Sequence, residues 1–262
     1  MDLYHLKTIA FAATYRGGAY IRHRLNRVRE IKHKGEIDLV TEVDLGSEKR
    51  IIEVIRTHFP DHAILSEEQG AGGGSADYKW IIDPLDGTTN FAHGLPTCCV
   101  SIALTKADQP LIGMIWCPFT DELFSAVRGQ GAFLNGRRIS VSKIDQVQDS
   151  LLVTGFPYNV KAIIETVMKR FTRCLASSQG IRRLGSAALD LGYVAAGRFE
   201  AFWEENLQPW DVAAGHLIVT EAGGCVTDFN NQPFQPEMKS ILASNGRIHS
   251  EMINLLTLKG TE

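Results

Sequence analysis

The spacing of the apolar residues changes near residue 78, and this change restricts the fold more than any other feature of the sequence. Before it, apolar residues recur at helical spacing from Leu3 to Leu25 and again from about Leu45 to Phe59, where Pro60 would end the helix. Asp44 stands at the expected N-cap position of the second helix. The N-terminal part of the chain therefore predicts two amphipathic helices.

From residue 78 onward the apolar runs are short and typical of strands. Leu134 to Arg137 contains an Asn-Gly pair, which predicts a tight hairpin turn. Because the connections between these runs are short, we expect neighbouring strands to pair in antiparallel fashion. The runs lie at 80–82, 98–106, 110–117 and 122–127.

Strand and helix signals alternate in the rest of the chain, which predicts an α+β fold with layers of helix and mixed sheet. No repeat or long linker divides the sequence, so we expect a single domain over residues 1–262, with sub-lobes at about 1–145 and 146–262. The strand signals lie at 150–155, 180–184, 199–203, 225–229 and 241–244, and the helical patterns lie near 160–175, 186–196 and 210–222.

Charge and cysteine content argue against several classes of partner. The chain has 27 Lys and Arg against 30 Asp and Glu, so it lacks the long-range attraction of a general nucleic-acid or anionic-membrane binder. The apolar stretch at 8–14 is too short for a membrane span or a signal peptide. Five cysteines without a C-x-x-C pair indicate a reducing, cytoplasmic compartment, and we interpret Cys98 and Cys99 as buried strand residues without a function.

The segment from Trp80 to Phe91 carries the strongest chemical signal. An apolar strand places Asp83 at its end, and Asp86 follows across a turn made by Pro84 and Gly87. Two carboxylates on one tight turn can bind divalent cations together, and free amides at the helix start that follows can bind a phosphate. Asp residues beside Pro and Gly also form ordinary turns, so this segment alone leaves both interpretations open.

Further acidic residues favour the metal site. Glu67 and Glu68 follow a short apolar run, and Asp211 begins an apolar helix, although an acid in that place is usually a helix cap. Two rival hydrolase classes fit less well. The Asp-x-x-Asp spacing differs from the Asp-x-Asp-Gly-Thr of haloacid-dehalogenase-like phosphatases, and no Gly-x-Ser-x-Gly elbow supports a serine hydrolase.

Taken in order along the chain, four segments resemble the inositol monophosphatase family, and the similarity extends over nearly the whole sequence. The segments are 37–44, 66–68, 80–91 and 210–215. The resemblance implies a layered α-β-α-β-α sandwich of the inositol monophosphatase and fructose-1,6-bisphosphatase type. It also implies a Mg²⁺-dependent phosphomonoesterase with two to three ions per site, sensitivity to lithium, and a homodimer.

The same resemblance assigns roles to individual residues. Thr88 and Asp44 would orient the attacking water, and Glu67 would contribute to catalysis beside them. The implied metal ligands are Glu67, Asp83, the carbonyl of Leu85, Asp86 and Asp211. The implied substrate-binding residues are Asp86, Gly87, Thr88, Gly185, Ser186, Ala187 and Glu204. Hydrolysis would then proceed by direct in-line attack of a metal-activated water, without a phosphoenzyme.

Some positions depart from the family pattern or leave a choice. Lys34 matches the family's lysine only loosely, and the same loop carries an additional acid, Glu36, so the roles of both stay open. The distance to Trp210 and Asp211 favours Glu204 as the acid that faces substrate. Strand alternation then makes Glu205 point elsewhere, into solvent, although a one-residue shift would exchange the two acids. Arg182 and Arg183 could bind the second phosphate of a bisphosphate substrate, although arginines on such a segment are more often exposed or at an interface.

The sequence therefore predicts a cytoplasmic hydrolase of small phosphate monoesters, with myo-inositol monophosphate as the leading substrate. Histidinol phosphate, fructose 1,6-bisphosphate, NADP and adenosine 3′,5′-bisphosphate are alternatives within the same class. An alternative from another class is a regulatory binding protein, for example of a transcription complex, with residual phosphatase activity. Neither a membrane nor nucleic acid is an expected partner.

Overall fold

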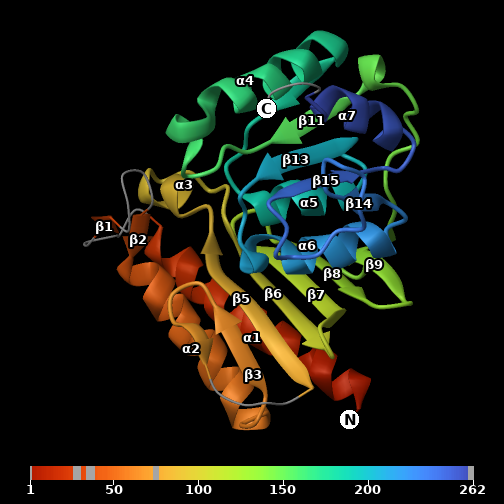
Figure 1. The fold of residues 1–262 in the computed structure, drawn as a ribbon. Coiled ribbons are helices and arrows are strands. Elements are labelled where there is room, and N and C mark those ends of the chain that lie inside the picture. The colour runs from red at the N-terminus through yellow and green to blue at the C-terminus, as the bar shows by residue number, and fades with distance from the viewer. Residues whose placement is uncertain (1, 26–30, 34–38, 73–76, 259–262) are drawn as a thin grey trace.

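Layers of helices and sheets alternate through the molecule in the order α-β-α-β-α (Figure 1). This computed structural model describes residues 2–25, 31–33, 39–72 and 77–258. Lys34 and Glu36 lie outside the described residues. Among the described residues, no helix is both long enough and apolar enough to cross a membrane. The predicted layered α+β sandwich is confirmed.

Helices α1 (Leu3–Arg24) and α2 (Glu42–His58) form the first layer and cover one face of the larger sheet (Figure 1). Their buried faces pack on that sheet, and Ile21 of α1, Ile51 of α2 and Trp80 of β5 belong to one buried apolar cluster. The prediction that Asp44 is the N-cap of the second helix was wrong, because α2 begins at Glu42 and Asp44 lies in its first turn. Negative charge is favourable in the first turn as well as at the cap.

The larger sheet has eight strands in the order β10-β9-β8-β7-β6-β5-β3-β4. The strands from β5 to β10 pair antiparallel in sequence order, as predicted, whereas β3 lies parallel to β5. Asn135 and Gly136 have positive φ angles of 49° and 76°, which suits the tight hairpin predicted there. The strands are β3 (Ala63–Ser66), β4 (Gly70–Gly72), β5 (Tyr78–Asp86), β6 (Cys99–Lys106), β7 (Gln109–Cys117), β8 (Glu122–Val127), β9 (Gly131–Leu134) and β10 (Arg137–Ile139).

The smaller sheet has five strands in the order β12-β11-β13-β15-β14. Helix α7 was not predicted, and it packs with α4 on the outer face of this sheet. The strands are β11 (Leu151–Thr154), β12 (Gly180–Arg182), β13 (Ala201–Glu205), β14 (Cys225–Thr227) and β15 (Ser240–Ser244). The helices of this half are α4 (Val160–Ser177), α5 (Ala187–Ala195), α6 (Pro209–Glu221) and α7 (His249–Leu256). The remaining elements are β1 (Ile31–His33), β2 (Leu39–Thr41), α3 (Thr88–Ala92) and a 3₁₀ turn at Val147–Asp149.

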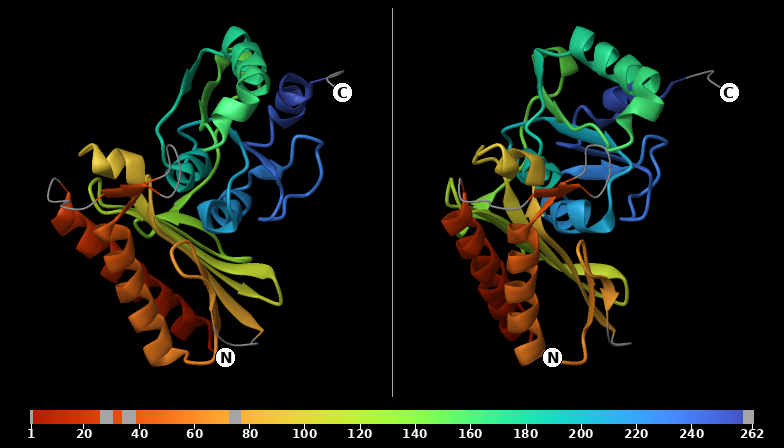
Figure 2. Two further views of the ribbon diagram at one scale, coloured as in Figure 1. Left: turned by 60° about the vertical axis from the view of Figure 1, so that its left-hand side comes forward. Right: turned by 90° about the vertical axis from the view of Figure 1, so that its left-hand side faces the viewer.

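Helices α5 and α6 form the middle layer between the two sheets (Figure 2). Helix α5 buries eight of its nine residues and α6 seven of its thirteen, and their apolar side chains share one core with strands of both sheets. Close approach depends in part on Gly113 of β7, because a Cβ there would lie 2.8 Å from the carbonyl oxygen of Ala214. The N-terminal ends of both helices line the same pocket as the carboxyl end of β5. The fold therefore brings these three chain segments together.

Candidate active site

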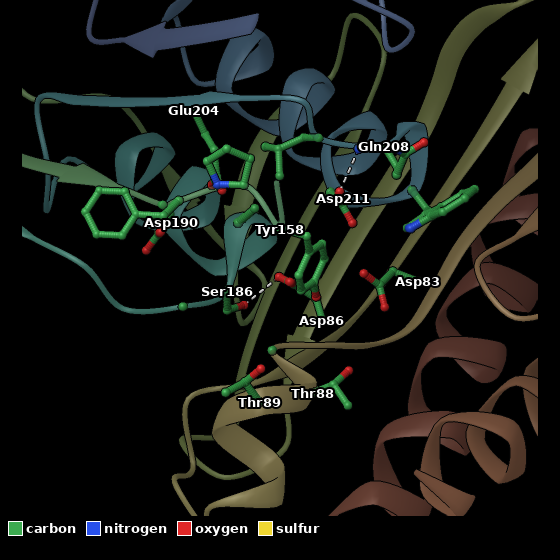
Figure 3. Close-up of a pocket in the computed structure, with 18 of the residues that line it drawn as sticks. Asp83, Asp86, Thr88, Thr89, Tyr158, Ser186, Asp190, Glu204, Gln208 and Asp211 are labelled. Carbon is green, nitrogen blue, oxygen red and sulfur yellow. Dashed lines mark hydrogen bonds between the residues drawn. The ribbon is translucent and has the colours of Figure 1, made fainter. Parts of the chain in front are cut away.

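One pocket of about 360 Å³ gathers most of the residues that the sequence singled out (Figure 3). Its lining includes Glu67, Asp83, Leu85, Asp86, Gly87, Thr88, Gly185, Ser186, Ala187, Glu204 and Asp211. We call the part formed by Glu67, Asp83, Asp86 and Asp211 the β5 end of the pocket, and the part formed by Glu204, Asp190 and Arg183 the β13 end. Asp44 is the one predicted site residue outside this lining, and it is fully buried.

A bulge at the end of β5 sets the spacing of the two central aspartates. Asp83 lies opposite Ser101 of β6 whereas Asp86 lies opposite Cys99, so the register shifts between them. Pro84 falls in this irregular stretch, where the N–H that proline lacks is not needed for the ladder. Oδ1 of Asp83 accepts a hydrogen bond from the Leu85 amide at 2.9 Å, which orients the carboxylate at the turn.

Gly87 turns the chain from β5 into α3. Its φ of 91° is left-handed, and a Cβ would lie 2.9 Å from the carbonyl oxygen of Thr97, so the position requires glycine. The turn brings Oγ1 of Thr88 to 2.9 Å from Oδ1 of Asp44 and 3.0 Å from the carbonyl oxygen of Leu85. The structure thus brings together the Thr88 and Asp44 pair, whose role stays a prediction.

Asp86 is held by three donors that share one of its oxygens. Oδ2 accepts hydrogen bonds from Oγ of Ser186 at 2.5 Å, from the Ala188 amide at 2.8 Å and from Sγ of Cys99 at 3.7 Å. Ser186 is also the N-cap of α5, since its Oγ accepts from the Leu189 amide. The hydroxyl of Ser186, which the sequence assigned to substrate binding, is therefore engaged within the protein as a positioning group for Asp86.

The other two carboxylates at the β5 end come from separate elements. Asp211 lies in the first turn of α6, where its Oδ2 accepts from the Gln208 amide at 2.7 Å, so it also serves as the helix cap considered for it. Glu67 follows β3. Glu48 of α2 fixes the turn after Glu67, because its Oε1 accepts hydrogen bonds from the amides of Glu68 and Gln69 at 3.1 and 3.3 Å.

Glu204 and Glu205 face opposite sides of β13. Glu204 is 7% exposed and lines the pocket, and its carboxylate lies so close to Gly155 that a Cβ there would collide with it. The prediction that Glu205 is solvated was wrong. Its Oε1 pairs with Nη1 of Arg170 at 2.8 Å, because α4 covers that face of the sheet. The acid that the distance to Trp210 and Asp211 had favoured, Glu204, is nevertheless the one that lines the pocket.

Two more charged residues belong to the β13 end. Asp190 of α5 is 1% exposed, and its Oδ1 has no hydrogen-bond partner among the described residues. Arg183 is exposed, as expected for an arginine on this segment, and it lines the pocket. Its guanidinium lies 5.8 Å from the centre of the Phe156 ring. Within the described lining, Arg183 is the only basic side chain.

Burial raises the pKa values of the carboxyls in the pocket. For Asp83 the largest cause is burial, followed by repulsion from Glu67 and Asp86. Burial also raises the pKa of Asp211, to which Asp86 adds, and it raises the pKa of Glu204 to about 8. Burial and repulsion between neighbouring carboxylates thus act together on Asp83 and Asp211 at the β5 end.

This donor set fits a hard divalent cation. Carboxylates and a carbonyl are the ligands that such cations prefer, and an ion would offset the repulsion that raises the pKa of Asp83. Within the described ranges, no three His, Cys, Asp or Glu side chains stand as a ready-made ligand cluster. A bound cation would attract these carboxylates and draw them closer together.

The fold and this site place the chain among phosphatases of the layered α-β-α-β-α type. The chain belongs to the inositol monophosphatase family, whose profile matches residues 2–259. It is 45% identical to an inositol-1-monophosphatase of Synechocystis over 97% of this chain and 90% of that protein. It is 43% identical to the Nus factor SuhB of Haemophilus influenzae, with 94% of this chain and 93% of that one covered.

Solved structures agree with this assignment. The extragenic suppressor protein SuhB of Bartonella henselae superposes with a TM-score of 0.93 at 39% identity, covering 98% of this chain and 100% of that one. The fold expected from the sequence is thus confirmed. The predicted enzyme class, an inositol-phosphate phosphatase, is confirmed at the level of the family by relatives that carry this name.

Sequence reasoning missed three residues that shape the site. Glu48 lies one helical turn after Asp44, and this spacing on one helix face could have revealed it. Asp190 is an isolated acid within an apolar helix, which is also a readable signal. Gly155 has no signal in the sequence, because its role depends on how closely Glu204 approaches it in the folded chain.

Proposed function

We propose that this chain is a Mg²⁺-dependent phosphomonoesterase that hydrolyses myo-inositol monophosphate to inositol and phosphate. The observation that carries the proposal is that the two ends of one pocket present acidic side chains in two different arrangements. The β5 end offers converging carboxylates for cations, and the β13 end offers the buried Glu204 for hydroxyl groups. A relative named inositol-1-monophosphatase, at 45% identity, supports the choice of substrate.

In this proposal the chain's own residues prepare the attack on phosphorus. When bound, the two to three Mg²⁺ ions would lower the pKa of a water and stabilise negative charge on the phosphate oxygens. The Thr88 hydroxyl donates its single proton to Asp44 or to the Leu85 carbonyl, so its lone pairs can accept a hydrogen bond from the attacking water. The residues that would hold the ions are Glu67, Asp83, Leu85 through its carbonyl, Asp86 and Asp211.

The remaining pocket residues would bind the two halves of the ester. Amides of Gly87 and Thr88, at the turn into α3, would donate to the phosphate oxygens. The backbone at Gly185 and Ala187 borders the alcohol at the start of α5, and the carboxyl of Glu204 would take hydrogen bonds from the inositol hydroxyls. Tight positioning of both halves lowers the entropy cost of reaching the transition state.

The proposal is tested by measuring phosphate release from a panel of esters, with Mg²⁺ and with a chelator. The panel contains myo-inositol 1-phosphate, histidinol phosphate, fructose 1,6-bisphosphate, NADP and adenosine 3′,5′-bisphosphate. We expect release from the inositol ester to be fastest and to stop when the metal is removed. A clear preference for another ester, or full activity in the chelator, would reject the substrate or the metal dependence respectively.

A lithium response, a homodimer and a cytoplasmic setting belong to the same proposal. Lithium should slow phosphate release beyond the effect of sodium at equal ionic strength, and that effect should depend on the Mg²⁺ concentration. Sedimentation of the purified chain should give twice the monomer mass. Equal effects of the two alkali ions, or a monomer at all concentrations, would remove the corresponding part of the proposal.

A second candidate is a regulatory binding role. It is favoured by the 43% identity to a relative named a Nus factor, which is nearly as high as the 45% identity to the named phosphatase. The two roles separate in the Asp86→Asn variant, since a binding surface outside the pocket would survive this change. Retention of a transcription-complex partner by an inactive Asp86→Asn protein would support the second role, and loss of both together would not.

A further inference from the structure

Asp190 has an environment that the fold alone does not account for. Its side chain is 1% exposed and lines the pocket, yet Oδ1 finds no hydrogen-bond partner among the described residues. Its neighbours on α5, Leu189 and Leu191, are fully buried and apolar. A buried carboxyl oxygen without a donor costs free energy, so its retention at this place calls for a partner from outside the chain.

Helix capping does not explain this residue. Ser186 already caps α5, and the Asp190 amide makes the ordinary helical hydrogen bond to the Ser186 carbonyl oxygen at 3.0 Å. An acid near a helix N-terminus gains from the helix dipole, but that gain does not require the side chain to be buried in a pocket. Capping of the helix therefore leaves Oδ1 of Asp190 without a donor among the described residues.

The groups around Asp190 indicate the kind of ligand. Figure 3 shows Asp190 and Glu204 on the left of the pocket and Asp83 on the right. Burial, followed by repulsion from Glu204 and Asp86, raises the pKa of Asp190, while Arg183 opposes this shift. Two neighbouring carboxyls with raised pKa values suit neutral donors such as alcohol hydroxyls better than a further anion.

We propose that Asp190 is a specificity-determining residue that hydrogen-bonds a hydroxyl of the polyol leaving group, next to the hydroxyl bound by Glu204. The inference rests on the proposed phosphatase function and goes beyond it by naming the group that selects polyol esters. Two acceptors from separate elements, α5 and β13, fit an alcohol with several hydroxyls on one ring. An ester without hydroxyls leaves both carboxyls unpartnered, and such a site rejects it.

The test compares two esters in the wild type and in Asp190→Asn. Myo-inositol 1-phosphate carries ring hydroxyls, whereas phenyl phosphate has none beyond the phosphate. We expect the substitution to lower kcat/KM for the inositol ester by about 10-fold to 100-fold, because the amide NH₂ that replaces one carboxyl oxygen leaves a buried hydrogen bond unmade. The value for phenyl phosphate should stay within about threefold, because that ester makes no contact with Asp190.

Thermal unfolding gives an independent readout. A residue kept for substrate binding at the expense of stability should give a higher Tm when its carboxyl is replaced by the neutral amide in Asp190→Asn. A residue kept for the fold should give a lower Tm. Glu200→Gln is the matched control, because Glu200 is 3% exposed, lies outside the pocket lining and accepts a hydrogen bond from the Leu151 amide. It should lower Tm and leave the ratio of the two esters unchanged.

The outcomes separate the inference from the function on which it rests. If the wild type prefers the inositol ester and Asp190→Asn keeps that preference, the inference is wrong and the proposed function stands. Equal losses on both esters with a lowered Tm also overturn the inference. If the wild type shows no preference for any hydroxyl-bearing ester, the proposed function fails first. Should Asp190→Asn not fold, Asp190→Ser takes its place in the same comparison.

Discussion

The two ends of the pocket are built in different ways. At the β5 end, the carboxylates of Asp83, Asp86 and Asp211 each accept hydrogen bonds from backbone amides. At the β13 end, Glu204 rests against Gly155, and Asp190 has an oxygen without a partner in the described part of the chain. Amides fix an orientation in advance, so the β5 end suits chemistry that tolerates little displacement. At the β13 end, a bound ligand would supply the hydrogen bond that Oδ1 of Asp190 lacks among the described residues.

Asp86→Asn should produce the largest loss and should not discriminate between substrates. A neutral amide cannot supply the charge that a cation site needs, and it places an NH₂ group where Oδ2 now meets donors. We expect phosphate release from every ester to fall by about 10³-fold or more, since loss of metal assistance removes several kcal/mol. Steady-state rates with the inositol ester and with phenyl phosphate measure this.

Equal losses on both esters would distinguish the β5 end from the β13 end, where the loss should be selective. Near-normal turnover with unchanged Mg²⁺ dependence would contradict the role given to Asp86. A circular dichroism spectrum like that of the wild type is the control for folding, because Asn keeps the shape of Asp.

Glu48→Gln should weaken the β5 end in a graded way. Glu48 is fully buried, and its carboxylate fixes the turn that follows Glu67. Residues that orient metal ligands change metal affinity by about 10-fold to 100-fold, so the Mg²⁺ concentration for half-maximal rate should rise by that factor. The exposed Glu53 on the same helix gives the control variant Glu53→Gln. A lower kcat at saturating Mg²⁺ with unchanged metal affinity would contradict this positioning role.

The same contrast explains how far the sequence could be read. Asp83 and Asp86 lie on one short turn, so a local pattern revealed the β5 end, and helical or strand periodicity revealed most elements of both sheets. Helix α7 and the parallel pairing of β3 with β5 were missed, because each depends on tertiary packing. The environments of Asp190 and Gly155 at the β13 end arise only when α5 and β13 meet in space.

Glu204→Gln should change the pH dependence of stability. Burial raises the pKa of Glu204 to about 8 from its ordinary value of 4.5, so the folded chain holds this proton more tightly than the unfolded chain. The stabilisation is fully present below about pH 4.5 and is lost as the pH rises through about 8. In a chelator, the wild type should therefore lose more stability than Glu204→Gln between about pH 5 and pH 9.

Thermal unfolding at both pH values measures the effect. We expect Tm of Glu204→Gln to exceed that of the wild type by several degrees at about pH 9, with a smaller difference at about pH 5. Glu205→Gln is the matched control, since Glu205 pairs with Arg170 and its loss should lower Tm at both values. Parallel pH curves for wild type and Glu204→Gln would show that this carboxyl titrates normally in the fold.

The smallest effects are expected at the adjacent cysteines, which face different layers. Cys98 is buried in the core with α1 and α2, whereas Sγ of Cys99 lies 3.7 Å from Oδ2 of Asp86 and 3.6 Å from Oγ of Ser186. A serine hydroxyl at 98 would be buried among apolar groups and should lower stability by about 1–3 kcal/mol without changing turnover. A hydroxyl at 99 can donate to Asp86, so Cys99→Ser should be the more stable variant, with kcat within about threefold of the wild type. Urea unfolding and phosphate release on the two variants test this order. If folded Cys99→Ser is inactive, the thiol itself takes part in holding Asp86. The β5 end of the pocket would then include Cys99 of the neighbouring strand β6 in addition to its carboxylates.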